Sequence, residues 1–461
     1  MIHNIEDTII AISTPPGIGA IAVIRLSGPK AISIVDSYFK PKKLADAATH
    51  TLHFGTLLDK MDNIIDEVVI GLFKQPHSYT KEDIVEISCH GSAYIQQQIM
   101  QLFLQDGIRL ANPGEFTMRA FLNGRLDLSQ AEAVGDLIAA ESASAHKIAM
   151  SNLKGGFSGE LSQLREELIH FASLIELELD FSEEDVAFAN RDDLKRLISK
   201  VLETLDRMIH SFELGNVLKN GVITVIAGRP NAGKSTLLNA LLNEDRAIVS
   251  EIAGTTRDTI EEVLNLEGIQ FRLIDTAGIR EAHDQIESLG VQRTFEKAKQ
   301  ASILVYVFDV ISCNKEEVIE DLQKIAHPIE KTIVIANKMD LNPYTKPEDF
   351  SNELLPLDNI ITASAIHKMN IPYLMQRLTS LVHSGDVQQG SSIVSNSRHL
   401  EALQGAKQSL EMALSNMDSG VTSDFIAMDI RSALFYIGTI TGQVGVEDLL
   451  DNIFSKFCIG K

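Results

Sequence analysis

The residues from Gly228 to Ser235 carry the strongest chemical signal in the sequence, because they read Gly-Arg-Pro-Asn-Ala-Gly-Lys-Ser. This order fits the phosphate-binding loop pattern Gly-x-x-x-x-Gly-Lys-Ser/Thr. In such a loop, main-chain N–H groups surround phosphate oxygens, Lys234 reaches the β- and γ-phosphates, and the Ser235 hydroxyl binds Mg²⁺. The apolar residues 222–226 predict a buried strand before the loop, and residues 236–242 predict a helix after it. Strand, loop and helix together predict a nucleotide-binding site.

Two further segments would complete the contacts to magnesium and to the γ-phosphate. The segment Asp-Thr-Ala-Gly that begins at Asp275 follows a predicted strand over residues 271–274. Its carboxylate is placed to reach Mg²⁺ through water, and the N–H of Gly278 to reach the γ-phosphate. Residues 254–258, Gly-Thr-Thr-Arg-Asp, lie between this segment and the phosphate loop. A mobile switch loop there would bring Thr256 to Mg²⁺.

A third group of residues predicts the choice of base. Residues 337–340, Asn-Lys-Met-Asp, follow a predicted strand over residues 332–336. The carboxylate of Asp340 can accept from guanine N1–H and N2–H₂, whereas adenine would leave it unpaired, so the site selects guanine. Ser364 and Ala365 would close over the base. The expected GTP-binding residues are Asn231, Ala232, Gly233, Lys234, Ser235, Thr236, Ser250, Glu251, Ile252, Ala253, Gly254, Thr255, Thr256, Asp275, Thr276, Ala277, Gly278, Asn337, Lys338, Asp340, Ser364 and Ala365.

Composition limits the class of protein that this chain can be. Hydrophobic residues make up 44% of the 461 residues, so large cores can form. The net charge of −22 argues against indiscriminate nucleic-acid binding. No apolar run approaches the roughly 20 residues that span a bilayer, and the N-terminus has no signal-peptide pattern. Three cysteines far apart in the sequence, none in zinc spacing, favour a reducing cytosol, so we expect a cytoplasmic protein without membrane contact.

The predicted elements divide the chain into four segments. Residues 1–119 mix strand-like and helical stretches, residues 120–215 have helical spacing, and residues 216–383 hold the nucleotide motifs. A capping box at Ser129 is predicted to open the first helix of the second segment. Residues 384–461 are again helical, and they form either a separate C-terminal domain or the remainder of the earlier bundle. We favour the second alternative, because each part alone has too few helices for a good core.

Several stretches resemble one family over the whole chain. The chain ends in Cys-Ile-Gly-Lys at residues 458–461, and the Thr-Pro-Pro-Gly of residues 14–17 also fits the family, as do residues 112–117, 119–128 and 254–258. Together they resemble the MnmE (TrmE) family of tRNA modification GTPases. The resemblance implies a multidomain α/β and α protein: an α+β folate-binding-like domain that dimerises, a discontinuous helical bundle, and an inserted Ras-like P-loop GTPase domain with a parallel-rich sheet flanked by helices.

The resemblance also implies a reaction and its cofactor. Members act with an FAD-dependent partner, MnmG (GidA), to add an aminomethyl or carboxymethylaminomethyl group at C5 of the wobble uridine of certain tRNAs. The added carbon would come from a tetrahydrofolate derivative, either 5-formyl- or methylene-tetrahydrofolate. The corresponding folate contacts are Arg25, Glu82, Arg125 and Lys461. Cys458 would act in the modification as a free thiol near this donor, the alternative being a small buried hydrophobic side chain beside Phe457.

The resemblance implies a hydrolysis mechanism that differs from that of Ras-type enzymes. Ile279 occupies the position of the water-orienting glutamine, so the family's catalytic glutamate falls on Glu287, whose alternative is a solvated acid. The family stabilises the transition state with K⁺ when two GTPase domains meet. The matching potassium ligands are Asn231, Ser250, Ile252 and Thr255. Arg257 in the same loop is a rival source of positive charge.

Two other functions share parts of this pattern. A ribosome-assembly GTPase of the Era or EngA kind has the same switch motifs, but it normally carries a KH-like RNA-binding domain with basic surroundings. The C-terminal part of this chain is acidic and ends in Cys-Ile-Gly-Lys instead. A folate-regulated assembly module without chemistry is the third alternative.

Overall fold

The computed structural model folds the chain into two compact units. One unit comprises Met1–Ala139, Ala149–Ile209 and Ser397–Lys461, and the other comprises Ala140–Ile148 and His210–Asn396. The structure describes residues 6–41, 43–180, 190–245, 261–275, 299, 301–383, 393–444, 450, 453–455 and 457–461. The four-segment division of the chain stays a prediction, and each unit is described by itself below.

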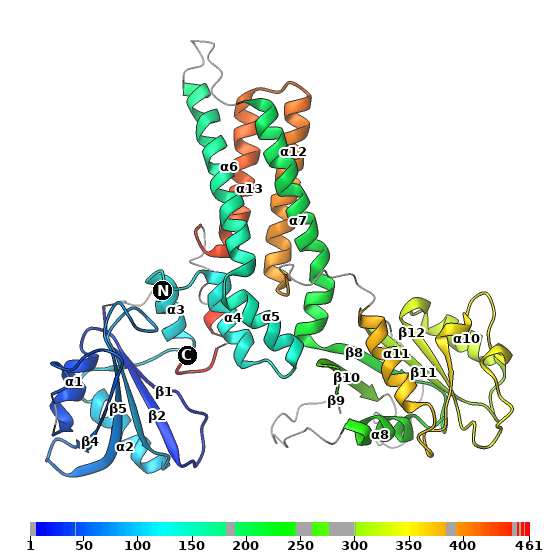
Figure 1. Cartoon of the computed structure of the whole chain (residues 1–461), viewed down its shortest axis with the longest axis horizontal. Helices are drawn as coiled ribbons and strands as arrows, with labels where there is room; N and C mark the ends of the chain where they lie inside the picture. The colour runs from blue at the N-terminus through cyan, green and yellow to red at the C-terminus, as the bar shows by residue number, and fades with distance from the viewer. Residues whose placement is uncertain are drawn as a thin grey trace, which may run out of the picture. The chain divides into compact units, whose positions relative to one another are not determined.

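The first unit contains a seven-stranded sheet near the N-terminus (Figure 1). Its strand order is β3-β4-β5-β6-β2-β1-β7, and neighbouring strands run antiparallel except for the parallel pair β1 and β7. Helices α1 (Ala31–Tyr38) and α2 (Ala93–Leu104) bury Val35 and Ile99 in one core with Ile24 of β2. The strands are β1 (Ile9–Ile12), β2 (Ile21–Ser27), β3 (Phe39–Lys40), β4 (Thr51–Leu58), β5 (Ile64–Phe73), β6 (Ile84–His90) and β7 (Arg109–Leu110).

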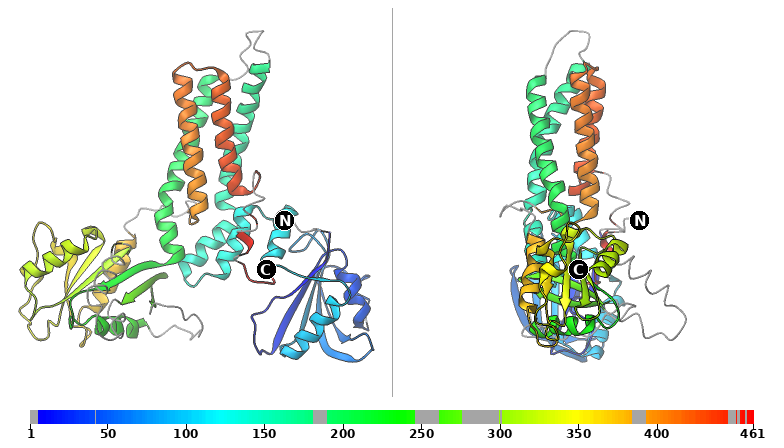
Figure 2. Two further views of the ribbon diagram at one scale, coloured as in Figure 1. Left: turned by 180° about the vertical axis from the view of Figure 1, so that it is seen from behind. Right: turned by 90° about the vertical axis from the view of Figure 1, so that its right-hand side faces the viewer.

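The same unit contains a helical bundle built from two distant parts of the chain. In both views of Figure 2, α12 and α13 run alongside α6 and α7. Fully buried residues recur every seven positions, as in Leu161 and Leu168 of α6 and in Leu403 and Leu410 of α12, so each helix turns one apolar stripe inward. The predicted discontinuous bundle is therefore confirmed. The helices are α3 (Glu115–Leu122), α4 (Leu128–Ile138), α5 (Ala143–Leu153), α6 (Gly156–Asp180), α7 (Arg191–Asn220), α12 (Ser397–Asp418) and α13 (Ser423–Thr441), of which α5 begins and α7 ends among residues assigned to the other unit.

The capping box predicted at Ser129 is wrong by two residues. Asp127 is the N-cap of α4, and its side chain accepts from the main-chain N–H of Gln130, whose own side chain accepts from the N–H of Asp127. Ser129 is buried in the first turn and donates to the Asp127 carboxylate at 2.9 Å. Both residues suit an N-cap, but the helix begins two residues before the position that serine alone suggested.

The second unit contains a six-stranded sheet in the order β13-β12-β11-β8-β10-β9. All its neighbouring strands are parallel except for the antiparallel pair β9 and β10. Helices α8 (Lys234–Asp245), α10 (Lys315–Ile325) and α11 (Ile371–His383) flank it, which confirms the predicted Ras-like domain. The strands are β8 (Val222–Ala227), β9 (Glu261–Leu266), β10 (Ile269–Asp275), β11 (Ile303–Asp309), β12 (Thr332–Asn337) and β13 (Ile360–Thr362). The three short 3₁₀ helices are Ile329–Lys331, Pro347–Asp349 and Leu357–Asn359.

Within the described ranges, every helix is too short or too polar to cross a membrane.

Candidate functional site

The phosphate loop joins the end of β8 to the start of α8, as the sequence predicts. At two of its glycines, both the positive φ and the lack of room for a side chain require glycine. Gly228 has φ 148°, and a Cβ atom there would lie 1.9 Å from the main-chain oxygen of Val307 on β11. Gly233 has φ 96°, and a Cβ atom would lie 2.3 Å from the amide nitrogen of Asn337. The loop therefore packs directly on neighbouring strands at both ends.

The side chain of Lys234 is bound by the main chain of the phosphate loop itself. The ammonium group of Lys234 donates to the main-chain oxygens of Gly228 at 3.0 Å and Arg229 at 2.9 Å. Only 8% of Lys234 is exposed. Its charge is therefore aimed into the concave side of the loop, where phosphate oxygens bind in proteins with this motif. Ser235 follows at the first turn of α8 and supplies a hydroxyl oxygen, a ligand type that Mg²⁺ prefers.

The segment predicted to recognise guanine is joined to the phosphate loop. Asn337 ends β12 and is buried. Its amide group donates to the main-chain oxygen of Ala232 at 2.8 Å, and its oxygen accepts from the N–H of Ala365 at 3.0 Å. Three segments that are distant in the sequence therefore meet at one side chain. The ammonium group of Lys338 binds the carboxylate of Asp309 at 2.8 Å.

The remaining base-binding residues lie near this junction. The carboxylate of Asp340 is 3.9 Å from a ring nitrogen of His367 and is partly exposed, so it is accessible to a ligand. The N–H of Met339 donates to Ala363 at 3.1 Å, which ties the segment of Asp340 to the residues that precede Ser364. Ser364 is buried and pairs with Met369. The edge of the sheet thus places the predicted carboxylate beside the Ser-Ala segment.

Other predicted residues lie outside the described part of the chain. Asp275 ends β10, where it is paired with Ile226 of β8, but its side chain is not described. The switch loop, the proposed water-orienting residue and three of the four proposed potassium ligands all lie outside the described ranges. These residues are Ser250, Glu251, Ile252, Ala253, Gly254, Thr255, Thr256, Arg257, Thr276, Ala277, Gly278, Ile279 and Glu287. Their roles stay predictions.

In the first unit, two of the predicted folate residues surround one aromatic ring. The guanidinium carbon of Arg25 lies 5.8 Å from the centre of the Tyr79 ring and 5.6 Å from that of Phe116. The guanidinium carbon of Arg125 lies 5.1 Å from the Tyr79 ring. Arg25 also pairs with Glu86 at 2.7 Å. The structure therefore brings Arg25 and Arg125 to the same aromatic ring, where each guanidinium lies within cation–π distance of Tyr79.

The third predicted folate residue belongs to a buried ionic network. Glu82 accepts from the hydroxyl of Ser27 at 2.6 Å and from the guanidinium of Arg119 at 3.2 Å. Arg119 is 1% exposed and also pairs with Glu115 at 3.0 Å and with Asp7. Burial raises the pKa of Glu115, but hydrogen bonds from its arginine neighbours outweigh burial and hold the pKa below its usual value. The network fixes the orientation of Glu82 through charged hydrogen bonds.

The segment that carries Cys458 docks onto the N-terminal sheet and α3. The N–H of Gly114 donates to the main-chain oxygen of Cys458 at 3.4 Å, and the N–H of Phe116 donates to that of Lys461 at 3.2 Å. The hydroxyl of Ser13 donates to the oxygen of Gly460 at 3.3 Å. The Cys458 side chain itself is exposed, which contradicts the alternative of a buried structural cysteine. Phe116 contacts both Arg25 and this segment, so it joins the two groups of predicted residues.

Sequence reasoning missed three residues that organise this site. Tyr79 contacts both arginines, Arg119 donates to Glu82, and Phe116 joins Arg25 to the C-terminal segment. Phe116 and Arg119 lie within the stretch that carries the family resemblance, so that stretch could have identified them. No local pattern marks Tyr79, because its two partners are distant in the sequence.

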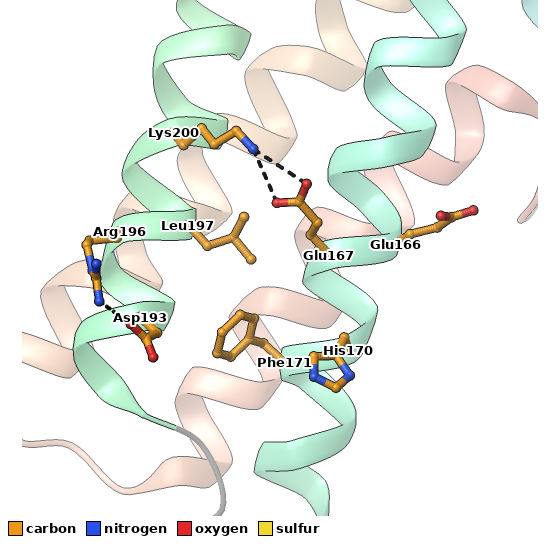
Figure 3. A pocket seen from close by; sticks show the side chains of 8 residues that line it. All are labelled: Glu166, Glu167, His170, Phe171, Asp193, Arg196, Leu197 and Lys200. Carbon is orange, nitrogen blue, oxygen red and sulfur yellow. Dashed lines mark hydrogen bonds and ion pairs between the residues drawn. The ribbon is translucent and has the colours of Figure 1, made fainter.

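A separate open pocket lies between α6 and α7 (Figure 3). It has a volume of about 610 Å³, and Phe171 and Leu197 provide apolar side chains between charged ones. The ammonium group of Lys200 pairs with Glu167 across it at 3.4 Å. None of the predicted site residues lines this pocket. The other lining residues are Glu166, His170, Asp193 and Arg196.

Two known domain families match this chain, one at the N-terminus and one over the rest of the chain. Residues 8–125 match the family described as "GTP-binding protein TrmE N-terminus", and residues 128–458 match the "MnmE helical domain". Among solved structures, the FeoB G-domain from Methanococcus jannaschii is 21% identical, with coverage of 35% of this chain and 97% of that chain and a TM-score of 0.27. A GTP-binding protein from Sulfolobus solfataricus in complex with GDP is 17% identical, covers 64% and 78%, and has a TM-score of 0.28.

Curated relatives are similar over their full length. The tRNA modification GTPase MnmE of Cytophaga hutchinsonii is 54% identical over 460 residues, which cover 100% of this chain and 99% of that protein. The protein of the same name from Flavobacterium johnsoniae is 50% identical and covers 99% of each chain. The protein of Bacteroides thetaiotaomicron is 49% identical and covers 99% of this chain and all of that one. With its phosphate loop and guanine segment in place, the chain is a GTPase, and it belongs to the MnmE family of tRNA modification GTPases.

Proposed function

We propose that this GTPase works with an FAD-dependent MnmG (GidA) partner to modify tRNA. The pair would add an aminomethyl or carboxymethylaminomethyl group at C5 of the wobble uridine, and GTP hydrolysis would drive the conformational cycle that permits it. The observation that carries the proposal is the exposed Cys458 on a segment docked beside Arg25 and its aromatic neighbours. The same chain holds a phosphate loop joined to a guanine segment, so it combines nucleotide binding with a separate chemical site.

The residues of the first unit suit a tetrahydrofolate derivative. Arg25 and Arg125 offer positive charge for the carboxylates of a glutamate tail, with Lys461 as a third cation, and Glu82 is an acceptor for the N–H groups of a pterin ring. Flat aromatic surfaces beside the cations suit a planar ring system. When bound, such a cofactor would supply the one-carbon unit, and the thiol of Cys458 would act next to it. We propose a homodimer with this domain at its interface.

For hydrolysis, we propose that Lys234 binds the phosphates and that Ser235 and Thr256 hold Mg²⁺. K⁺ would bind between Asn231 and the switch loop when two GTPase domains meet, and Glu287 would orient the attacking water. The full set of proposed potassium ligands is Asn231, Ser250, Ile252 and Thr255. The hydroxyl and carbonyl oxygens in this set are ligands that an alkali cation prefers.

The potassium proposal is tested by measuring GTP turnover in KCl and in NaCl at equal ionic strength. We expect faster turnover in KCl. Equal rates in both salts would refute the role of K⁺, and a collapse of turnover in Arg257→Ala would support the rival arginine instead.

The proposed function as a whole is tested by mass spectrometry of nucleosides from tRNA of cells that lack this protein. We expect the C5-modified wobble uridines to disappear, and to return with the wild-type protein but not with Lys234→Ala. An unchanged nucleoside profile together with abnormal ribosomal subunits would overturn the proposal in favour of an assembly GTPase of the Era or EngA kind.

A further inference from the structure

The second residue of the phosphate loop, Arg229, is tied by its side chain to helix α10. We propose that Arg229 is a positioning residue for GTP: its side chain fixes the start of the loop to α10, and its main-chain oxygen thereby fixes the ammonium group of Lys234. The inference concerns the GTPase activity that the whole family shares. It therefore does not depend on the tRNA modification step or on the partner protein proposed above.

The side chain of Arg229 is held by two carboxylates on successive turns of α10. Its Nε donates to one oxygen of Asp321 at 2.7 Å, and a terminal nitrogen lies 3.4 Å from the other oxygen. The second terminal nitrogen donates to Glu317. A planar guanidinium bound at two carboxylates has a defined orientation that a single flexible ion pair lacks. Asp321 and Glu317 raise the pKa of Arg229 above its ordinary value.

Both carboxylates are themselves held in place. The hydroxyl of Tyr306, a fully buried residue of β11, donates to Asp321 at 2.6 Å. Glu317 is the third residue of the capping box of α10, where it accepts from the N–H of Asn314 at 3.0 Å. Arg229 is therefore bound to a prearranged pair of acceptors on a capped helix, and its side chain cannot leave α10 without breaking its hydrogen bonds to both carboxylates.

The main chain of the same residue reaches the phosphate-binding lysine. The oxygen of Arg229 accepts from the ammonium group of Lys234 at 2.9 Å, beside the oxygen of Gly228 at 3.0 Å. Gly228 in turn packs so closely on Val307 of β11, the residue after Tyr306, that no side chain would fit there. Release of the arginine side chain would free the carbonyl that orients Lys234, so nucleotide affinity would fall even though the Arg229 side chain itself is bound to the carboxylates of α10.

The experiment compares variants on both sides of this contact in the full-length protein. Titration with fluorescent GDP and a non-hydrolysable GTP analogue gives the dissociation constants of Arg229→Gln, Asp321→Asn and the double variant. We expect each single variant to weaken the binding of both nucleotides by about threefold to tenfold. This is the range that partly exposed charged hydrogen bonds contribute. The double variant should be no weaker than the worse single variant, because both changes break the same connection.

A matched control separates this effect from a general weakening of α10. Lys324→Gln breaks the ion pair between Lys324 and Glu320, 2.7 Å apart on the same helix. This ion pair is more exposed than the Arg229 contacts and does not reach the loop. Its nucleotide affinity should be unchanged. Arg229→Lys should recover part of the lost affinity, since it keeps the charge and one hydrogen bond.

Two results would overturn the inference. The first is unchanged nucleotide affinity in Arg229→Gln with a lowered melting temperature, which would make the contact purely structural. The second is a double variant whose losses add, which would mean that Arg229 and Asp321 act independently. If Arg229→Gln does not fold, Glu317→Gln and Arg229→Lys test the same connection with milder changes.

Discussion

The side-chain amide of Asn337 donates to the main-chain oxygen of Ala232 at 2.8 Å, so the guanine-binding segment and the phosphate loop are held together by one side chain. Asn337 also accepts from the N–H of Ala365 at 3.0 Å. Because all three groups are buried, the loss of either hydrogen bond leaves a polar atom without its partner. Base recognition and phosphate binding therefore depend on the same residue.

We expect Asn337→Asp to lower GTP affinity by about tenfold to a hundredfold, since a carboxylate cannot donate to Ala232 and would face its oxygen instead. Isothermal titration of GDP and GTP would measure the change. Asn359→Asp is the matched control, because the amide of Asn359 also donates to two main-chain oxygens, at 2.6 and 2.8 Å, but away from the loop. An equal loss of affinity in the control would mean that the effect is only one of stability.

Asp340→Asn should change which base the protein prefers. The carboxylate accepts from two guanine donors, whereas an amide places a donor at one of those positions and matches the oxygen of xanthine. We expect GTP turnover to fall by roughly tenfold or more and turnover of xanthosine triphosphate to rise. Competition between the two nucleotides would measure the switch, and a variant that stays selective for guanine would place base recognition elsewhere.

Gly460→Ala should release the segment that carries Cys458. Gly460 has φ 96°, and an added Cβ would lie 2.4 Å from the main-chain oxygen of Ile12. The backbone conformation alone costs alanine about 1 kcal/mol, and the clash adds to it. We expect tRNA modification to fall while GTP hydrolysis is retained, measured by nucleoside analysis and phosphate release.

Gly420→Ala is the control for this substitution. Gly420 also has a positive φ, 66°, but an added Cβ would meet no atom within 4 Å. It carries the same conformational cost without the clash, so modification should persist. If Gly460→Ala modifies tRNA normally, docking of the C-terminal segment is not required for the reaction.

Glu132 should make the stability of the helical bundle depend on pH. Burial raises the pKa of this carboxyl, but hydrogen bonds from His399 at 2.7 Å and from Arg398 outweigh burial and lower the pKa from 4.5 to about 2. A lowered pKa stabilises the folded state fully above pH 4.5, and this stabilisation is lost as the pH falls toward 2. The shift corresponds to about 3 kcal/mol.

Thermal unfolding followed by circular dichroism between pH 7 and pH 3 would measure this dependence. Glu132→Gln should be less stable than the wild type at pH 7, and the difference should shrink below pH 4.5. Glu401→Gln, at an exposed position of α12, should follow the wild type. A difference between Glu132→Gln and the wild type that stays constant with pH would rule out ionisation of Glu132 as the cause.

The sequence determined the local elements and the kind of chemistry. Residues 222–242 read as strand, loop and helix, and the structure has β8, the phosphate loop and α8 there. This was predictable because hydrophobic periodicity and glycine positions act over a few residues. The order of the nucleotide motifs, and the residues 112–128 and 458–461 that resemble the family, identified the class of GTPase. The N-cap of α4 was misplaced because Asp127 and Ser129 both suit that position and only packing chooses between them.

Only the tertiary structure decided which distant residues meet. The hydrogen bond from Asn337 joins residues 105 positions apart, and the hydroxyl of Ser13 reaches a residue 447 positions away. Likewise, no pattern in the sequence showed that Tyr79 contacts two arginines or that Arg229 is bound to α10. Local patterns record how each segment folds, but the partner of a buried polar group depends on how whole elements pack, which no short stretch of sequence specifies.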